Sequence, residues 1–285
     1  MVTPKRSVPP RLLGAHLSTQ GGWEKMLQRA QALSCGCVQI FASNPRSWSG
    51  TVITRASANI YQALAPRFGV EALVVHAIYL VNLASPSPVT AARSFKSVVS
   101  DLGAARYLGA KVFVLHPGSD TGKGGGEARL VQALRRLRPH VAPGQRILLE
   151  GMASPPGRLG HLATLGRIVR AAGKHVGVCL DSAHLCAAGY DLADAADFNR
   201  FDRDLKRWIG YQRIGCLHGN DSRQPCGSHR DHHENLGEGF VGRAGLARIL
   251  AHPAVQKVPV IIETPGFDDL GPDLKNMRRL RQYAG

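Results

Sequence analysis

One pattern recurs eight times along the chain and constrains its fold more than any other feature. A short apolar run ends in a polar residue, and an amphipathic stretch with helical spacing follows it. The runs are short and rich in β-branched residues, which is typical of buried parallel strands. We predict strands at residues 12–15, 37–42, 72–75, 112–115, 147–149, 176–180, 214–217 and 258–262. We predict helices at residues 22–33, 55–68, 89–108, 127–138, 158–172, 193–209, 243–251 and 268–283.

This alternation of strand and helix predicts an α/β fold, specifically a closed (β/α)8 TIM barrel, with an open doubly wound sheet as the alternative. The chain has 285 residues, which suits a single barrel of roughly 250 residues. No segment resembles a linker, so we expect one barrel domain at residues 12–285 after an N-terminal extension at residues 1–11. The glycine-rich residues 118–126 are expected to form a loop, because they do not match the G-x-x-x-x-G-K-[ST] phosphate-binding motif.

The polar residues that end the apolar runs are the main indication of function. They are His16, Ser43, His76, His116, Glu150, Asp181, His218 and Glu263. Parallel strands of a barrel all end at one rim, so these side chains are expected to meet there. A single histidine at a strand end is more often structural than a ligand, but seven of these eight positions are His, Asp or Glu. Carboxylates gathered this closely repel one another, and a divalent cation with carboxylate and imidazole ligands removes that cost.

Two further pairs extend this set of ligands beyond the strand ends. His184 follows Asp181 by three residues, and Asp231 and His233 form a D-x-H pair in a polar loop. We therefore expect a metal site at the rim. The remaining histidines, apart from His229 and His232, are expected at the surface: His140, His161, His175 and His252.

The net charge indicates the kind of partner, and the cysteines indicate the cellular compartment. The formal net charge is +16, which favours a polyanionic partner such as DNA, although a generally basic proteome is the plainer explanation. The cations are spread along the chain, which predicts a folded basic face rather than a basic tail. The six cysteines form no paired C-x-x-C motifs, and several lie in apolar runs, as free thiols often do. With no signal peptide or membrane span in the sequence, a reducing cytoplasm is expected.

Several ordered motifs make the chain similar to the endonuclease IV family of apurinic/apyrimidinic (AP) endonucleases over residues 12–280. The motifs are GAHLSTQGG (14–22), VHAIYLVNLASP (75–86), HPGS (116–119), LDSAHLCAAGYD (180–191), HGNDS (218–222), DHHENLGEG (231–239) and IIETPG (261–266). The resemblance implies a zinc-dependent (β/α) barrel that acts as a monomer on double-stranded DNA with abasic sites. It implies hydrolysis of the phosphodiester 5′ to the abasic site, in DNA base excision repair.

The resemblance also implies roles for particular residues. Three zinc ions would be held by nine residues, with Mn²⁺ possible at one site. One ion would take His76, His116 and Glu150, the second Glu150, Asp181, His218 and Glu263, and the third His184, Asp231 and His233. Glu263 and Glu150 would be catalytic, with Glu150 bridging two ions and Glu263 positioning the nucleophile. Arg46, Tyr79 and Leu80 would enter the DNA at the lesion.

The chain departs from the family's pattern at several positions beside the expected site. Residues 151–154 are Gly-Met-Ala-Ser where the family usually has Asn-Thr-Ala-Gly, and Ile78 replaces a frequent Pro. Ser47 replaces a frequent Gln, and His232 stands where Arg is common. Two alternatives fit the same residues: a metal-dependent sugar isomerase or epimerase on the same fold, and a non-catalytic nucleic-acid-binding protein with structural zinc.

Overall fold

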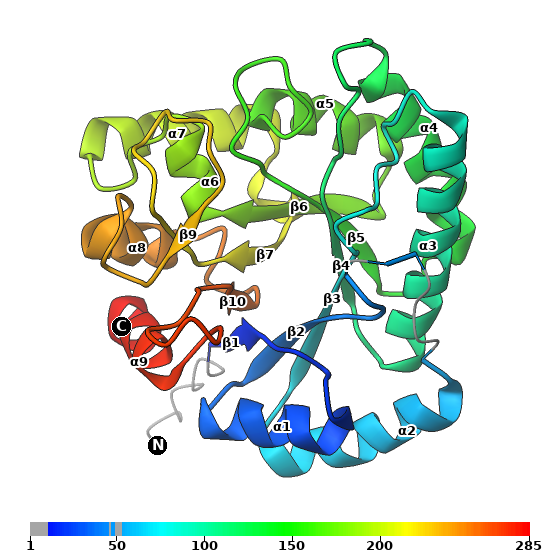
Figure 1. Cartoon of the computed structure of the whole chain (residues 1–285). Coiled ribbons are helices and arrows are strands. Elements are labelled where there is room, and N and C mark those ends of the chain that lie inside the picture. The colour runs from blue at the N-terminus through cyan, green and yellow to red at the C-terminus, as the bar shows by residue number, and fades with distance from the viewer. Residues whose placement is uncertain (1–10, 46, 49–52) are drawn as a thin grey trace, which may run out of the picture.

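The computed structural model describes residues 11–45, 47–48 and 53–285 and has a closed barrel of eight parallel strands at its centre (Figure 1). The barrel closes because β1 pairs with both β2 and β10. This confirms the predicted (β/α)8 TIM barrel and excludes the open sheet. The barrel strands are β1 (Leu13–His16), β2 (Cys37–Phe41), β3 (Ala72–His76), β4 (Val112–Leu115), β5 (Arg146–Glu150), β6 (Val176–Asp181), β7 (Ile214–His218) and β10 (Val260–Ile262).

Helices surround the barrel, as Figure 1 shows. The long helices pack an apolar stripe on the strands, as in α4, where Leu130, Leu134 and Leu137 are fully buried while Arg135 and Arg136 face solvent. The helices are α1 (Gly22–Ala32), α2 (Arg55–Leu64), α3 (Pro88–Tyr107), α4 (Gly126–Leu137), α5 (Leu162–Ala172), α6 (Ser182–Ala187), α7 (Ala195–Trp208), α8 (Gly242–Ala251) and α9 (Leu274–Ala284). Short 3-10 turns lie at Ala65–Phe68, Arg138–His140 and Tyr211–Arg213.

Two helices start four or more residues later than the sequence predicts, because caps fix their first turns. The predicted helix at 268–283 begins at Leu274, since Gly271 has a positive φ of 102° and Pro272 follows it. Asp273 then caps the helix by accepting a hydrogen bond from the Asn276 amide at 2.8 Å. The predicted helix at 158–172 begins at Leu162 behind a His161 cap. Two elements were not predicted at all: α6, and a hairpin of β8 (Asp221–Ser222) and β9 (His233–Glu234).

The barrel interior is a solid apolar core rather than a channel. Seven fully buried side chains fill it: Cys37, Val74, Val114, Leu148, Cys179, Cys216 and Ile261. Because this plug closes the barrel from within, a ligand reaches the strand ends only from the rim. Cys35, Cys37, Cys179 and Cys216 are free and buried, whereas Cys186 and Cys226 form a disulfide.

The predicted extension lies outside the described residues except for Arg11, whose guanidinium donates to the carbonyls of Leu250 and Ala284. His252 was predicted at the surface but is 5% exposed, because its Nε2 lies 3.0 Å from Asp202 Oδ1 among aromatic rings.

Within the described part of the chain, the structure contains no helix with the length and apolar character needed to cross a membrane.

Candidate metal centre

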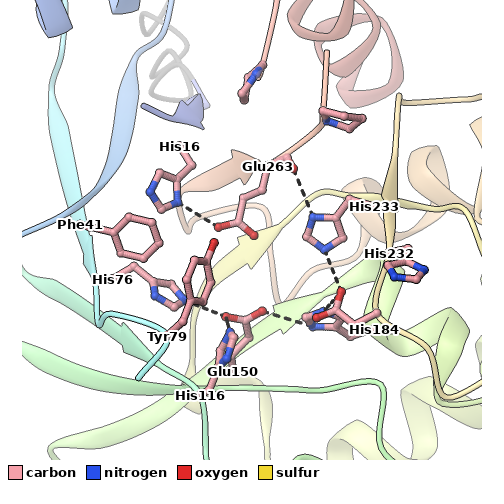
Figure 2. Close-up of a pocket in the computed structure, with 13 residues that line it drawn as sticks. His16, Phe41, His76, Tyr79, His116, Glu150, His184, His232, His233 and Glu263 are labelled. Atoms are coloured by element: carbon pink, nitrogen blue, oxygen red, sulfur yellow. Dashed lines mark hydrogen bonds and ion pairs between the residues drawn. The ribbon is translucent and has the colours of Figure 1, made fainter. Parts of the chain in front are cut away.

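Seven of the nine predicted metal ligands line one cavity of about 480 Å³ at the carboxyl-terminal rim of the barrel. Some of them come from the strand ends and the others from the adjoining segments. Figure 2 shows imidazoles and carboxylates from separate strands turned toward the same space. The other two, Asp181 and His218, are fully buried beside it at the ends of β6 and β7. The cavity is lined by His16, Phe41, His76, Tyr79, His116, Glu150, His184, Asp231, His232, His233, Glu263, Pro265 and Pro272.

The ligand atoms form three overlapping groups whose members lie within 4.8 Å of one another. The first contains His76, His116 and Glu150, and the second contains Glu150, Asp181, His218 and Glu263. The third contains Asp181, His184 and His233. Asp231 adjoins this third group, because its Oδ1 lies 2.9 Å from His184 Nε2 and 3.6 Å from His233 Nε2. The predicted sets of ligands are therefore neighbours in space.

Glu150 lies at the point where the groups meet. Its Oε2 is 3.1 Å from His76 Nε2 and 3.4 Å from His116 Nε2. Its Oε1 is 3.2 Å from His184 Nδ1 and 3.4 Å from His218 Nδ1. One carboxylate thus contacts residues from all three groups, which is the position a bridging ligand requires.

Carbonyl oxygens next to the histidine rings select the nitrogen that can bind a metal. Nδ1 of His76 lies 2.6 Å from the Ala77 carbonyl, and Nδ1 of His184 lies 2.8 Å from the Gly151 carbonyl. His233 Nδ1 lies 3.2 Å from the Glu263 carbonyl. Since a carbonyl only accepts, Nδ1 carries a proton in each ring, which leaves Nε2 as the nitrogen that could bind a metal ion in the cavity.

His218 is oriented the other way round. Its Nε2 lies 2.9 Å from Gln39 Oε1, so Nδ1 is the nitrogen left for a ligand. His218 Nδ1 and His184 Nε2 are both buried and have no hydrogen bond to the described residues, although carboxylate oxygens lie 3.3 Å and 2.9 Å away. A cation between each nitrogen and the carboxylates would satisfy both, so the residues present fit divalent metal ions.

The pKa shifts within the cluster also favour bound divalent cations. Burial raises the pKa of Glu150, but the positive fields of His218 and His116 outweigh it and hold that pKa well below its ordinary value. Burial lowers the pKa of His218, but Glu263 and Glu150 raise it well above the ordinary value of an imidazole. Without a metal, protonated histidines therefore compensate the buried carboxylates, and divalent cations would replace those protons.

Sequence reasoning missed two fully buried amides that hold this cluster together. Asn220 Nδ2 donates to Asp181 Oδ2 at 2.7 Å, and its Oδ1 accepts from the Glu263 amide at 2.8 Å. Gln39 Nε2 donates to Glu263 Oε1 at 2.6 Å. The available signal was the strand period of two, because Cys37 points into the barrel and Gln39 shares its face.

The remaining strand-end residues behave differently from one another. His16 joins the cluster, with Nδ1 3.1 Å from Glu263 Oε1. Ser43 does not line the cavity, and its hydroxyl instead donates to Asp101 Oδ1 at 3.4 Å. The unusual segment at residues 151–154 contributes through its backbone, since the Gly151 carbonyl orients His184.

Short elements outside the barrel position the third group. Asp181 caps α6 by accepting from the His184 amide at 2.9 Å, which sets the two side chains one turn apart. The β8–β9 hairpin fixes His233, and the loop between its strands reaches back to α6. There the Cys186–Cys226 disulfide and a 2.9 Å hydrogen bond from the Gly227 amide to the Cys186 carbonyl tie the loop down.

The predicted DNA-contacting residues lie beside the cavity where the structure describes them. Tyr79, after β3, is 63% exposed, lines the cavity and packs on Phe41 with 5.1 Å between ring centroids. Leu80 is exposed next to it. Arg46 lies outside the described residues.

Comparison with known proteins gives a consistent result. The family model described as "Xylose isomerase-like TIM barrel" matches residues 27–283. The "Probable endonuclease 4" of Chloroflexus aurantiacus is 34% identical over 278 residues, covering 95% of this chain and 97% of that protein. The crystal structure of endonuclease IV from Thermus thermophilus is 34% identical with a TM-score of 0.84, covering 96% of this chain and 98% of that one. A 3-keto-D-glucoside 4-epimerase from E. coli shares the fold alone, at 15% identity and a TM-score of 0.67, covering 96% and 99%.

Proposed function

Because the chain belongs to the endonuclease IV family of the xylose isomerase-like TIM barrels, we propose that it is a zinc-dependent AP endonuclease. It hydrolyses the phosphodiester 5′ to an abasic site in double-stranded DNA and leaves a 3′-OH and a 5′-deoxyribose phosphate. The observation that carries this proposal is the convergence of three His/Asp/Glu groups around Glu150 at one rim. Its expected setting is cytoplasmic DNA base excision repair, as a monomer, with residues 1–11 outside the barrel domain.

The three groups would hold three zinc ions, and Mn²⁺ would also suit one site because oxygen and nitrogen ligands accept it. His76 and His116 would hold the first ion with Glu150, and Asp181, His218 and Glu263 would hold the second with Glu150. His184 and His233 would hold the third with Asp231, which adjoins them. When bound, such ions activate water and neutralise charge on the phosphate and on the leaving oxygen.

Glu263 is the residue best placed to position the attacking water. Its Oε1 accepts from Gln39 and lies beside His16, which fixes the carboxylate plane. Its Oε2 lies 3.3 Å from both His218 Nδ1 and Asn220 Nδ2. A carboxylate held on both oxygens turns little, so it presents one defined direction to a water molecule and its proton.

Selectivity for abasic sites follows from the cost of opening the duplex. A nucleotide without a base has no stacking or pairing to lose, so it leaves the helix at little cost. Tyr79 and Leu80, with Arg46, would fill the gap that remains, since aromatic and apolar side chains support neighbouring bases. Phe41 backs Tyr79 and lines the cavity that receives the sugar.

One paired assay separates this function from the sugar isomerase alternative, which the fold alone supports. The purified protein is given a synthetic abasic duplex, an intact duplex of the same sequence and a panel of ketoses. We expect nicking of the abasic duplex only. Ketose epimerisation without nicking would establish the alternative, and loss of the fold on zinc removal with no activity on either substrate would favour a structural zinc protein.

A further inference from the structure

Many cations of this chain lie at the end of the barrel opposite to the metal centre. Five neighbouring strands, β4, β5, β6, β7 and β10, each have a cation as their first residue or within three residues before it. These cations are Lys111, Arg146, Lys174, Arg213 and Lys257. Since parallel strands share one direction, their amino ends form one continuous arc. The residues within three positions before the barrel strands include a single acidic residue in the described chain, Glu71.

The helices add to the same face, because each runs back antiparallel to its strand. A basic residue lies in the last turn of seven of the eight long helices, α1 to α5 and α7 to α9. None of these last turns contains an acidic residue. Figure 1 shows α3, α4, α5 and α7 following one another around the barrel, so their ends continue the arc of strand cations.

Part of this charge serves the fold. Arg213 donates to the carbonyls of Val169 and Val176, and Arg135 donates to the Ala171 carbonyl, so these side chains satisfy exposed helix and strand ends. Six other cations at this end are exposed, and no described residue forms a hydrogen bond or an ion pair with their side chains. They are Arg67, Arg106, Lys111, Arg138, Lys174 and Lys257.

The exposed cations also frame a small cleft. Arg138, Lys174 and His175 line a cavity of about 360 Å³ between the end of α4 and the start of β6. His175 is fixed there by its Nε2, 3.0 Å from the Leu134 carbonyl. Such a cleft suits a phosphate group, because two flexible cations flank it.

We infer that this amino-end face, defined by Lys111, Arg138, Lys174, His175 and Lys257, binds a second segment of duplex DNA. Charge of one sign without a matching acidic neighbour is stabilised by a polyanion, through Coulomb attraction and release of counterions. A membrane surface would require apolar side chains to insert, and among the described large hydrophobic residues that are exposed, Tyr107 is the one in a last helical turn. The inference goes beyond the proposed cleavage, because it concerns intact DNA at the opposite end of the molecule.

A two-duplex capture experiment tests the inference. Protein bound to an immobilised intact duplex is offered a second, labelled intact duplex, and the retained label is measured over a range of salt concentrations. The double variant Arg138→Glu/Lys174→Glu is compared with Lys25→Glu/Arg203→Glu, which changes the net charge equally at exposed positions on α1 and α7. We call Arg138→Glu/Lys174→Glu the cleft variant and Lys25→Glu/Arg203→Glu the control. We expect the wild type and the control to retain the second duplex and the cleft variant to lose it. The slope of log K against log [salt] for duplex binding should be smaller in this variant than in the wild type by about 2, because each of the two lost phosphate contacts removes about 0.9 from it.

The outcomes separate this inference from the proposed function. The cleft variant should nick a short abasic duplex at the wild-type rate, since both substitutions lie far from the rim. Three results would overturn the inference. The cleft variant could retain the second duplex, the control could lose it equally, or the face could bind anionic vesicles in place of duplex. A wild type that bridges two intact duplexes but nicks no abasic DNA would leave the inference standing and defeat the proposed activity.

Discussion

Gln39 donates a hydrogen bond from Nε2 to Glu263 Oε1 at 2.6 Å, although 224 residues separate them in the sequence. The Oε1 atom of the same side-chain amide accepts a hydrogen bond from His218 Nε2. A single neutral, fully buried side chain therefore fixes both the carboxylate expected to position water and an imidazole expected to bind metal. This relationship makes Gln39 a positioning residue of the centre.

Replacing Gln39 by Ala should weaken metal binding while the barrel still folds. Supporting residues of metal ligands typically contribute about 10–100-fold in affinity or activity. We expect a metal affinity lower by that factor, measured by competition with a chelator, and a lower kcat with little change in KM. Gln39→Glu should be worse than Gln39→Ala, because it places a carboxylate against Glu263. Equal metal affinity in all three proteins would show that Gln39 only fills space.

The Cys186–Cys226 disulfide should support the group of His184, Asp231 and His233. It links the helix that carries His184 to the loop that carries Asp231. We expect Cys186→Ser/Cys226→Ser to show faster hydrogen exchange in residues 223–233 and to retain about two metal ions per chain rather than three. Reduction of the wild type by a dithiol should reproduce both effects and leave the variant unchanged. Full metal content in the reduced protein would contradict this role.

The same disulfide should contribute to global stability. It joins cysteines 40 residues apart, and the chain-entropy model gives about 4 kcal/mol for a loop of that length. Thermal unfolding of the double serine variant under oxidising conditions measures this contribution. An unchanged melting temperature would mean that the two thiols are not bonded in the folded protein.

Asp101 should make stability depend on pH away from the metal centre. Burial raises its pKa to about 7, partly offset by the Ser43 hydroxyl, and its Oδ2 has no hydrogen-bond partner among the described residues. Between the ordinary value of 3.8 and about 7, the folded chain holds a proton that the unfolded chain releases. The Asp101 contribution therefore destabilises the fold increasingly as pH rises through this window.

Asp101→Asn should remove that dependence. We expect its melting temperature to exceed that of the wild type above the window, with a difference that shrinks as pH falls toward about 4, near the unfolded pKa. The difference between the two proteins isolates Asp101 from the carboxylates of the rim. A constant offset at all pH values would show that Asp101 is ionised throughout.

Tyr79 should contribute to the choice of damaged over intact DNA. Loss of an aromatic ring that stacks on bases typically costs about 1–3 kcal/mol. Tyr79→Ala should therefore weaken binding of an abasic duplex about 5- to 140-fold relative to an intact duplex, at unchanged metal content. Tyr79→Phe keeps the ring against Phe41 and should behave as the wild type. Loss of binding to both duplexes equally would assign Tyr79 a general role.

Much of the rim was predictable, because one local rule produces it. An apolar run followed by a polar residue places that residue at a strand end, and closure of the barrel brings the ends together. Glu150, Asp181 and Glu263 were found in this way without knowledge of their partners. Helix starts were less predictable, because a single cap residue such as Asp273 decides where a helix begins, and the starts predicted at 268 and 158 were six and four residues too early.

The partners of the buried amides could not be predicted from the sequence. Gln39 lies in mid-strand, where a polar side chain has no local explanation, and its contacts depend on which strands close the barrel. The location of the positive charge was equally hidden. The sequence predicted a folded basic face, but only the strand directions show that many of its cations lie at the end opposite to the metal centre.

The most direct test of the account is product analysis on an abasic duplex before and after the metals are stripped. We expect the native protein to leave a 3′-OH and a 5′-deoxyribose phosphate, the stripped protein to leave the duplex intact, and added Zn²⁺ to restore cutting. Glu263→Gln should bind the same duplex and cut it at least about 10²-fold more slowly. Cutting that survives chelation, or 3′ ends left by elimination rather than hydrolysis, would contradict the claim that this rim hydrolyses DNA with bound metal.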